Sequence, residues 1–320
     1  MVLSPDGRVL IVADENGVVF IDTARLISGE GDPVLGSIDD QQGIPPDTAV
    51  YMGPQRTSDT HEPGSTYVNV TADGRFLFVS DEWTQAITVI DLRQGFSHAA
   101  VVGRIPVGVL PVALSFSHDQ RLLFTTSQIG LESYGWPVEC KDEQAPPGQT
   151  APVHRQGAIL VIDVAKAETD PSRSGISKAP AGCAPVRLVI SPDGKSAYVT
   201  ARNSNAMLVF DTVKLVTDPM HASIGEVPVG TAPVGIANIE GGRWIVVTNS
   251  NRFAGNANDR QSLTLIDATR ISSGAAAIAG SIEAGAFPRE IQVTADQRTM
   301  LVTNFASKTL EMIDIQRLPK

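Results

Sequence analysis

Short apolar runs separated by polar turns follow one another along the chain, and the same arrangement recurs six times. Six segments align without gaps; they start at residues 4, 71, 117, 191, 239 and 294 and read SPDGRVLIVAD, TADGRFLFVSD, SHDQRLLFTTS, SPDGKSAYVTA, IEGGRWIVVTN and TADQRTMLVTN. Each is followed by a second apolar run that ends in an aspartate, at Asp22, Asp91, Asp163, Asp211, Asp267 and Asp314. The starts lie 67, 46, 74, 48 and 55 residues apart, so a base period of about 46 to 48 residues with insertions accounts for all of them.

The runs have the character of β-strands. They are short and rich in Val, Ile and Leu, and the turn residues between them, such as Pro-Asp-Gly, favour tight reversals of the chain. Four short strands in about 40 to 50 residues are typical of a propeller blade. The sequence therefore predicts an all-β fold, a β-propeller of four-stranded blades in a single domain over residues 1–320. The repeated aspartates are expected to cap backbone N–H groups at turns, because a ring needs one reactive site and not six.

A Gly-x-x-Pro motif precedes four of the six segments, at residues 108–111, 182–185, 230–233 and 285–288. Glycine permits an unusual backbone angle there, and proline fixes the chain as it enters the innermost strand. These motifs, the Ser-Pro-Asp-Gly turns and the Tyr-Val-Thr, Val-Thr-Asn runs ending at Thr200, Asn249 and Asn304 resemble those of the YVTN-repeat, or YncE-like, β-propellers over nearly the whole chain. The resemblance implies a fold and leaves the activity open, because this family hosts many activities.

The two ends of the repeat array depart from the pattern. The first repeat begins near Met1 without a Gly-x-x-Pro motif, and the chain ends soon after the third strand of the sixth repeat. Ring closure normally pairs both ends within one blade, so that no long strand edge is left open. The visible repeats predict six blades; an outer strand, and in the alternative a seventh blade, is expected upstream in a longer parent chain.

Composition and charge exclude several classes of protein. With 320 residues, 42% hydrophobic and 19% charged, the chain can bury a large core. No apolar run approaches the roughly 18 residues of a membrane span. A net charge of −10 argues against nucleic acid or an anionic membrane as a partner. A small anionic molecule or a protein partner remains.

Three insertions point to one face. If the strands of a blade are labelled A to D from the centre outward, the D-to-A and B-to-C connections open at one end of the blade, which we call the upper end. The insertions at about 40–66, 129–157 and 251–261 all fall in such connections. Long loops on a rigid scaffold commonly carry binding sites, so the upper end is the candidate site.

The two cysteines support the same choice. Cys140 lies in the second insertion and Cys183 in the Gly-x-x-Pro motif of the next blade, so both are predicted at the upper end of adjacent blades. A bridge between them is geometrically reasonable, although two unpaired thiols remain the alternative. A bridge would indicate an oxidising compartment, hence a secreted or periplasmic protein whose signal peptide lies outside this sequence.

Residues that break the repeat at the upper end are the candidate site. They include four arginines, which suit a carboxylate or phosphate ligand, although inter-blade salt bridges explain them equally well. The predicted ligand-binding residues are Arg187, Arg202, Arg252, Arg289, Glu82, Tyr67 and Trp136. This first hypothesis is a non-catalytic module that binds a small anion or a protein.

The second hypothesis is an enzyme. The chain also resembles, more loosely, the lactonase and carboxymuconate-cyclase propellers, which open or close lactone rings with His, Glu and Arg at the channel mouth. His154, His61 and Glu290 are the candidate acid or base residues, because their chemistry permits proton transfer near neutrality. No single residue matches a motif position of that family, so the sequence does not decide between the two hypotheses.

A metal-dependent lactonase is the third hypothesis. Glu290, Asn249, Asn304 and Glu82 offer oxygen donors suited to calcium, but Asn249 and Asn304 belong to the repeat itself. We therefore predict no metal site and no cofactor, with calcium as the exception to test.

Overall fold

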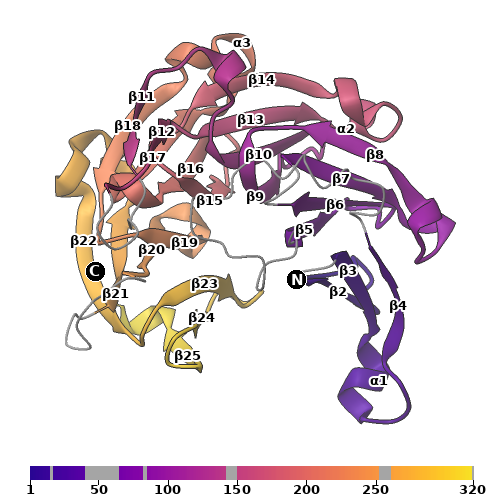
Figure 1. Cartoon of the computed structure of the whole chain (residues 1–320). Helices are drawn as coiled ribbons and strands as arrows, with labels where there is room; N and C mark the ends of the chain where they lie inside the picture. The colour runs from indigo at the N-terminus through magenta and orange to yellow at the C-terminus, as the bar shows by residue number, and fades with distance from the viewer. Residues whose placement is uncertain (15–16, 40–64, 82–84, 142–149, 252–260, 319–320) are drawn as a thin grey trace. The chain divides into compact units, whose positions relative to one another are not determined.

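The protein is described by a computed structural model that covers residues 1–14, 17–39, 65–81, 85–141, 150–251 and 261–318. Its contacts divide it into two compact units. Unit 1 comprises Met1–Gly135, Pro146–Thr150 and Ile159–Ser177, and unit 2 comprises Trp136–Ala145, Ala151–Ala158 and Lys178–Lys320. Figure 1 shows strands throughout both units, which confirms the predicted all-β class.

Each repeat forms one antiparallel sheet, here called a blade. Unit 1 holds blade 1, with β1 (Val2–Leu3), β2 (Val9–Asp14), β3 (Gly17–Asp22) and β4 (Val34–Ile38), and blade 2, with β5 (Ser65–Val70), β6 (Phe76–Asp81), β7 (Ala86–Asp91) and β8 (Val101–Pro106). Blade 3 consists of β9 (Val109–Phe116), β10 (Leu122–Ile129), β13 (Ala158–Asp163) and β14 (Gly175–Pro180). The boundary between the units runs through β13 and β14.

Unit 2 holds blades 4, 5 and 6 and a hairpin. Blade 4 contains β15 (Pro185–Ile190), β16 (Ser196–Ala201), β17 (Ala206–Asp211) and β18 (Ser223–Pro228), and blade 5 contains β19 (Pro233–Ile239), β20 (Trp244–Asn249), β21 (Gln261–Asp267) and β22 (Ile278–Ala284). Blade 6 consists of β23 (Pro288–Val293), β24 (Thr299–Asn304) and β25 (Thr309–Asp314). The hairpin pairs β11 (Val138–Lys141) with β12 (Val153–Arg155) and lies in the predicted insertion of blade 3.

Helices are short and lie in the connections. The α-helices are α1 (Thr23–Ser28), α2 (Val164–Ala167) and α3 (Thr212–Thr217). The 3-10 helices are η2 (Leu92–Gln94), η3 (His98–Ala100), η4 (Glu132–Tyr134), η5 (Pro171–Arg173), η6 (Arg202–Ser204), η7 (Pro219–His221), η8 (Glu240–Gly242), η9 (Ala268–Ala277) and η10 (Ile315–Arg317). In the part of the chain that the structure describes, no helix has the length and apolar character needed to cross a membrane.

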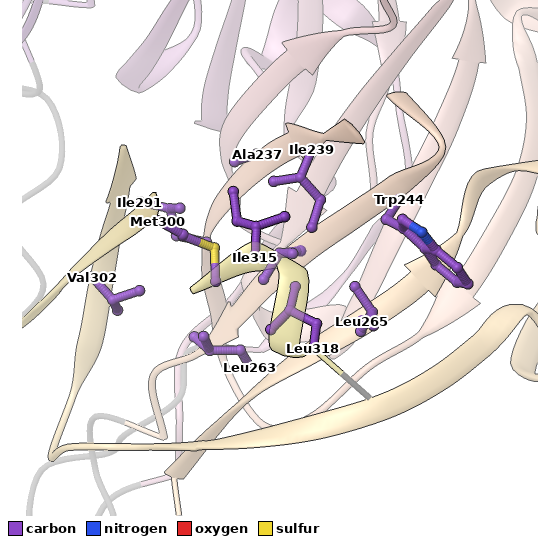
Figure 2. Close-up of a cluster of buried hydrophobic side chains, with 11 residues drawn as sticks. Ala237, Ile239, Trp244, Leu263, Leu265, Ile291, Met300, Val302, Ile315 and Leu318 are labelled. Carbon is purple, nitrogen blue, oxygen red and sulfur yellow. The ribbon is translucent and has the colours of Figure 1, made fainter. Parts of the chain in front are cut away.

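The core lies between neighbouring blades. In unit 2, residues of blades 5 and 6 interdigitate in one cluster, among them Ile239, Leu263, Met300 and Val302, each fully or almost fully buried (Figure 2). In β21, the third strand of blade 5, Leu263 and Leu265 are fully buried. In blade 6 the corresponding Leu310 and Met312 of β25 are 59% and 74% exposed, and β25 pairs with β24 alone among the described residues.

The aspartates that end the third strands are caps, as predicted. Asp22, Asp91, Asp163, Asp211, Asp267 and Asp314 each accept a backbone N–H from the helix that follows. Each leaves the strand in an extended conformation and satisfies a donor that the first helical turn cannot pair internally. These carboxylates therefore belong to the scaffold.

The Gly-x-x-Pro motif works differently from the prediction. Three of its four glycines have no positive φ; the left-handed residue is the third one, Leu110, Ala184, Ala232 or Phe287, with φ between 51° and 59°. Glycine is needed for space instead. A Cβ on Gly230 would lie 2.4 Å from Cγ of Asn249, and a Cβ on Gly285 would lie 2.7 Å from Nδ2 of Asn304. The asparagine of the repeat therefore packs directly against the glycine of its own blade.

The aspartates of the A-to-B turns are held by a second repeated set of contacts. In blade 4, Asp193 accepts the hydroxyl of Ser191 at 2.6 Å and the backbone N–H of Lys195 at 3.1 Å. The same two contacts lower the pKa of all five such carboxyls from the ordinary 3.8, the Ser or Thr hydroxyl having the larger effect: Asp6, Asp73, Asp119, Asp193 and Asp296.

These lowered pKa values predict a loss of stability in acid. An unfolded aspartate titrates near 3.8 and the native ones titrate lower, so the turns stabilise the fold above about pH 5 and lose that contribution as the pH falls below 3.8 and through the native pKa values. The urea midpoint of unfolding at pH 3 is therefore expected below that at pH 6. Asp193→Asn should reduce the difference between these two midpoints. Glu226→Gln, which removes an exposed carboxylate of β18, is the control. An unchanged difference in Asp193→Asn would contradict the assignment.

Candidate functional site

A bulge near the start of each inner strand builds the upper end of the blades. The register between the inner strand and the second strand shifts just after the proline in blades 4, 5 and 6. The backbone N–H of the second residue after the proline then bonds a threonine hydroxyl of the second strand: Arg187 to Thr200, Gly235 to Thr248 and Glu290 to Thr303, at 3.1, 2.7 and 3.2 Å. Arg187, Gly235 and Glu290 are therefore equivalent positions on three successive blades.

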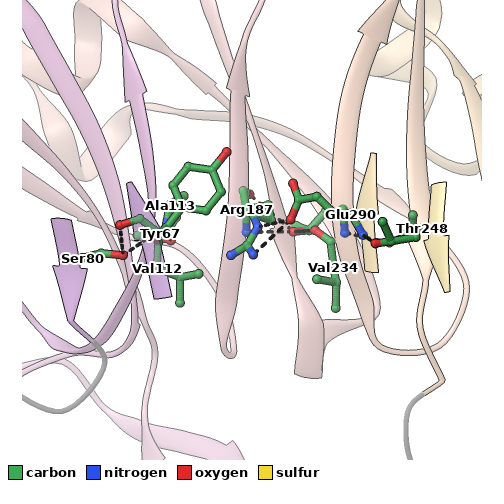
Figure 3. A network of polar contacts seen from close by, with 12 residues as sticks. Tyr67, Ser80, Val112, Ala113, Arg187, Val234, Thr248 and Glu290 are labelled. Carbon is green, nitrogen blue, oxygen red and sulfur yellow. Dashed lines mark hydrogen bonds and ion pairs between the residues drawn. The ribbon is translucent and has the colours of Figure 1, made fainter. Parts of the chain in front are cut away.

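The same hydroxyls connect one blade to the next. Thr200 Oγ1 lies 2.7 Å from the Val234 carbonyl oxygen of blade 5, and in unit 1 Ser80 Oγ lies 2.8 Å from the Val112 carbonyl oxygen of blade 3 (Figure 3). Because each hydroxyl is buried and bonded on both sides, the inner strands have little freedom to shift. The threonine of the repeat is thus a structural bridge that fixes side chains at the equivalent positions.

Arg187 and Glu290 meet across blade 5. Arg187 Nε and Nη2 lie 3.2 and 3.1 Å from the same oxygen of Glu290, Oε2 (Figure 3). The intervening blade carries Gly235 at the equivalent position, so no side chain separates the two. A Cβ on Gly235 would lie 2.6 Å from the carbonyl oxygen of Arg289, so this glycine also lets blades 5 and 6 approach closely.

The environments of the two charges differ. The side chain of Arg187 is 9% exposed and that of Glu290 is 31% exposed. Glu290 Oε1 accepts no hydrogen bond from any of the described residues, whereas Oε2 accepts two from Arg187. A buried arginine needs a partner charge, because a single buried charge costs several kcal/mol, about 3 to 5 by analogy with other broken pairs. Arg187 therefore orients Glu290 through Oε2 and leaves Oε1 without a donor among the described residues.

A second group of side chains stands beside the pair in blade 6. The Arg289 guanidinium carbon lies 5.7 Å from the centre of the Phe305 ring, and Phe287 meets Phe305 at 5.3 Å with the rings inclined by 63°. Phe305 is 62% exposed. Arg289 was predicted as a ligand-binding residue; the two phenylalanines were missed. A comparison of each position across the blades would have found them, because blades 4 and 5 have small residues where blade 6 has Phe287.

The hairpin β11–β12 is tied to blade 4. Cys140 and Cys183 form the predicted disulfide, with their Cα atoms 5.5 Å apart, and Asn203 Nδ2 donates to the carbonyl oxygen of Lys141 at 2.9 Å. Trp136, a predicted ligand residue, immediately precedes this hairpin and is half-buried.

His154 lies on β12 of this hairpin and is buried. Its Nδ1 is 2.8 Å from the carbonyl oxygen of Arg155. A carbonyl oxygen only accepts, so Nδ1 carries a proton in this contact.

The other predicted residues fall on separate elements or outside the described residues. Arg202 begins η6, where its backbone N–H donates to the carbonyl oxygen of Ala184. Tyr67 lies on β5 of unit 1. His61, Arg252 and Glu82 lie outside the described residues.

The two asparagines of the calcium hypothesis are used by the scaffold through their amide nitrogens. Asn249 Nδ2 donates to Ser262 and Thr264, and Asn304 Nδ2 donates to Thr309, so both side chains brace their own blades. Within the described ranges, no three His, Cys, Asp or Glu side chains gather in a way that would hold a metal ion. Calcium remains a prediction that a direct titration tests.

Comparisons with known proteins show the fold. No protein-family model matches the chain, and no curated protein matches it. Among solved structures, a proposed 6-phosphogluconolactonase from Bacteroides fragilis aligns with a TM-score of 0.66 at 11% identity, over 98% of this chain and 78% of that one. One of the same description from Bacteroides uniformis aligns with a TM-score of 0.66 at 14% identity, over 99% and 81%.

A protein of unknown function from Desulfotomaculum acetoxidans aligns with a TM-score of 0.55 at 14% identity, over 93% of this chain and 76% of that one. At these identities the likeness shows the fold, a β-propeller, and leaves the activity to be argued from the site. Neither comparison of sequences tests the YncE-like resemblance.

Proposed function

We propose that the chain is a lactone hydrolase in which Glu290 acts as the general base and Arg187 positions it. The observation that carries the proposal is the half-satisfied carboxylate: Nε and Nη2 of Arg187 both hold Oε2, Oε1 has no donor among the described residues, and the Glu290 side chain is 31% exposed. A carboxylate held on one oxygen is well placed to take a proton with the other. The likeness in fold to two proposed 6-phosphogluconolactonases supports the choice of a lactone as substrate.

The reaction needs only water as the second reactant. Glu290 Oε1 takes a proton from a water molecule, and the water oxygen forms a bond to the lactone carbonyl carbon. The tetrahedral intermediate then collapses, the ring C–O bond breaks, and the departing alkoxide takes the proton from Glu290. The product is the open-chain hydroxy acid. Arg187 acts by keeping Oε1 in place and touches no reacting atom in this scheme.

The same pair also suits the binding-only hypothesis. The ion pair is neutral overall, and Oε1 is a hydrogen-bond acceptor. A ligand that binds at Oε1 should therefore carry hydroxyl groups that donate to it and not a negative charge. A secreted or periplasmic location is part of either proposal and is supported by the disulfide between Cys140 and Cys183. A protein partner remains a prediction.

The test measures acid release from lactones. D-glucono-1,5-lactone and γ-butyrolactone are followed in a pH-stat, with the spontaneous rate subtracted. Glu290→Gln is expected to lower kcat at least 100-fold with KM little changed, because removing a positioned base typically costs a factor of 10² to 10⁴. Glu226→Gln is the matched control, since Glu226 is an exposed carboxylate on β18 of blade 4, whereas Glu290 lies on β23 of blade 6.

Arg187 tests the positioning role. Arg187→Lys keeps a charge and one donor, so kcat should fall less than in Arg187→Met while KM moves little in both. Full turnover in Glu290→Gln would overturn the proposal. Binding of the lactones without acid release, seen as a raised Tm, would replace the hydrolase with the binding module. If the chain neither hydrolyses nor binds any lactone, a lactone is rejected as its ligand.

A further inference from the structure

Blade 6 departs from blades 4 and 5 at three positions of the upper end. The residue before the motif proline is Ala184 in blade 4, Ala232 in blade 5 and Phe287 in blade 6. The residue after the proline is Val186, Val234 and Arg289 in turn. The residue that follows the second strand is Arg202, Ser250 and Phe305.

The backbone is the same in all three blades, so the scaffold does not require the large residues. Ala232 and Phe287 are both left-handed, with φ of 51° and 59°. Their carbonyl oxygens accept equivalent backbone bonds, from Ser250 at 3.0 Å and from Phe305 at 2.8 Å. A phenylalanine is less comfortable than alanine in the left-handed region, so Phe287 is not explained by the stability of the turn.

The three departures contact one another. Arg289 lies over the Phe305 ring at 5.7 Å, and Phe287 meets the same ring at 5.3 Å in an edge-on contact. Phe305 is nevertheless 62% exposed, and Arg289 is exposed as well. A single exposed phenylalanine means little, but three coordinated changes that assemble an exposed aromatic ring and an arginine indicate a binding surface.

We propose that Phe287, Arg289 and Phe305 form a subsite for a flat ring that bears a carboxylate or phosphate. The edge-on contact with Phe287 fixes the plane of Phe305, so its exposed surface offers a stacking platform. Arg289 contacts the same ring through a cation–π interaction, and a guanidinium is a planar fork that bonds a carboxylate or phosphate in a bidentate manner.

The subsite adjoins the proposed base. Arg289 is the neighbour of Glu290 in the bulge of β23, where Pro288 pairs with Asn304 and Glu290 pairs with Thr303. The subsite and the proposed base therefore belong to the same end of β23. The inference rests on the proposed function only in assigning that end to the reaction; binding of the ring and its anion is independent of it.

The test uses phenyl phosphate, inorganic phosphate and glucose 6-phosphate as probes of the intact chain, with affinities from isothermal titration calorimetry. Phenyl phosphate is expected to bind about tenfold more tightly than inorganic phosphate, because only the former stacks. Phe305→Ser should remove that advantage and leave inorganic phosphate unchanged. Arg289→Val should weaken both by at least tenfold.

Phe305→Ser and Arg289→Val each introduce the residue that blade 5 has at the equivalent position, so the fold is expected to tolerate them. Arg298→Gln, at the opposite end of blade 6, controls for the loss of one positive charge. Glu290→Gln should leave phenyl phosphate binding within about twofold, which separates this subsite from the proposed hydrolysis.

Several outcomes would overturn the subsite. Equal affinity for phenyl phosphate and inorganic phosphate in the unmodified chain removes the stacking platform. A Tm lowered by several degrees in Phe305→Ser, with unchanged affinity, shows a structural role instead. Tighter binding of glucose 6-phosphate than of phenyl phosphate replaces the flat ring with a saturated one and contradicts the ligand class proposed.

Discussion

The variant Gly230→Ala is expected to lose about 3 kcal/mol or more of its free energy of unfolding. The added Cβ would lie 2.4 Å from Cγ and 2.6 Å from Nδ2 of Asn249, closer than any real contact allows. Asn249 is 3% exposed and donates to Ser262 at 3.0 Å and to Thr264 at 2.9 Å, so it has no open space to move into. Overpacking costs about 1 to 3 kcal/mol, and each buried hydrogen bond lost adds roughly 1 kcal/mol.

Urea unfolding of Gly230→Ala measures this loss, and Gly175→Ala is the matched control. Gly175 has nothing within 4 Å of its would-be Cβ and no positive φ, so alanine there should leave the stability unchanged or slightly raised. The contrast separates steric exclusion from a general intolerance of the repeat to alanine. If the two variants unfold at the same urea concentration, the glycine of the motif serves some purpose other than close packing against Asn249.

The scaffold could be predicted from the sequence because its physics is local and repeated. An apolar run of strand length, a Pro-Asp-Gly turn and a terminal aspartate each specify a structure within a few residues, and six copies remove the ambiguity of any single one. Cys140 and Cys183 were paired correctly because the repeat placed both at the same end of adjacent blades. The sequence predicted that the motif glycine provides an unusual backbone angle, which was wrong for Gly230. The packing of Asn249 against Gly230 depends on the bulge, which cannot be predicted from the sequence.

The candidate site was less predictable because it depends on which side chains reach across blades. Arg187 and Glu290 were both singled out for breaking the repeat, but 103 residues separate them and their pairing follows from Gly235 in the blade between. Phe287 and Phe305 were passed over, because each alone resembles an ordinary exposed apolar residue. Their contacts with each other and with Arg289 are what indicate a binding surface, and these contacts are formed only in the folded chain.

Loss of the disulfide is expected to destabilise unit 2 by about 4 kcal/mol. Cys140 and Cys183 close a loop of 43 residues, and restricting the unfolded chain by a loop of this length is worth roughly that amount in the chain-entropy account. Cys140 is 1% exposed, so its bond also anchors β11 from within the packed hairpin. Without it, Asn203 still donates to the carbonyl oxygen of Lys141, and one such bond contributes about 1 kcal/mol.

The double variant Cys140→Ser/Cys183→Ser, unfolded in urea with and without reductant, measures this contribution. The unmodified chain should lose stability on reduction and approach the double variant, which should not respond to reductant at all. The effect reaches the proposed site, because Cys183 stands two residues before Pro185 and four before Arg187 on the strand that carries the buried guanidinium. If the hairpin tether matters for orienting Glu290, reduction will lower kcat on lactones more than it lowers the affinity for phenyl phosphate. Equal urea midpoints in the two redox states, with two free thiols titrated after reduction, would show that the bridge contributes nothing to the fold.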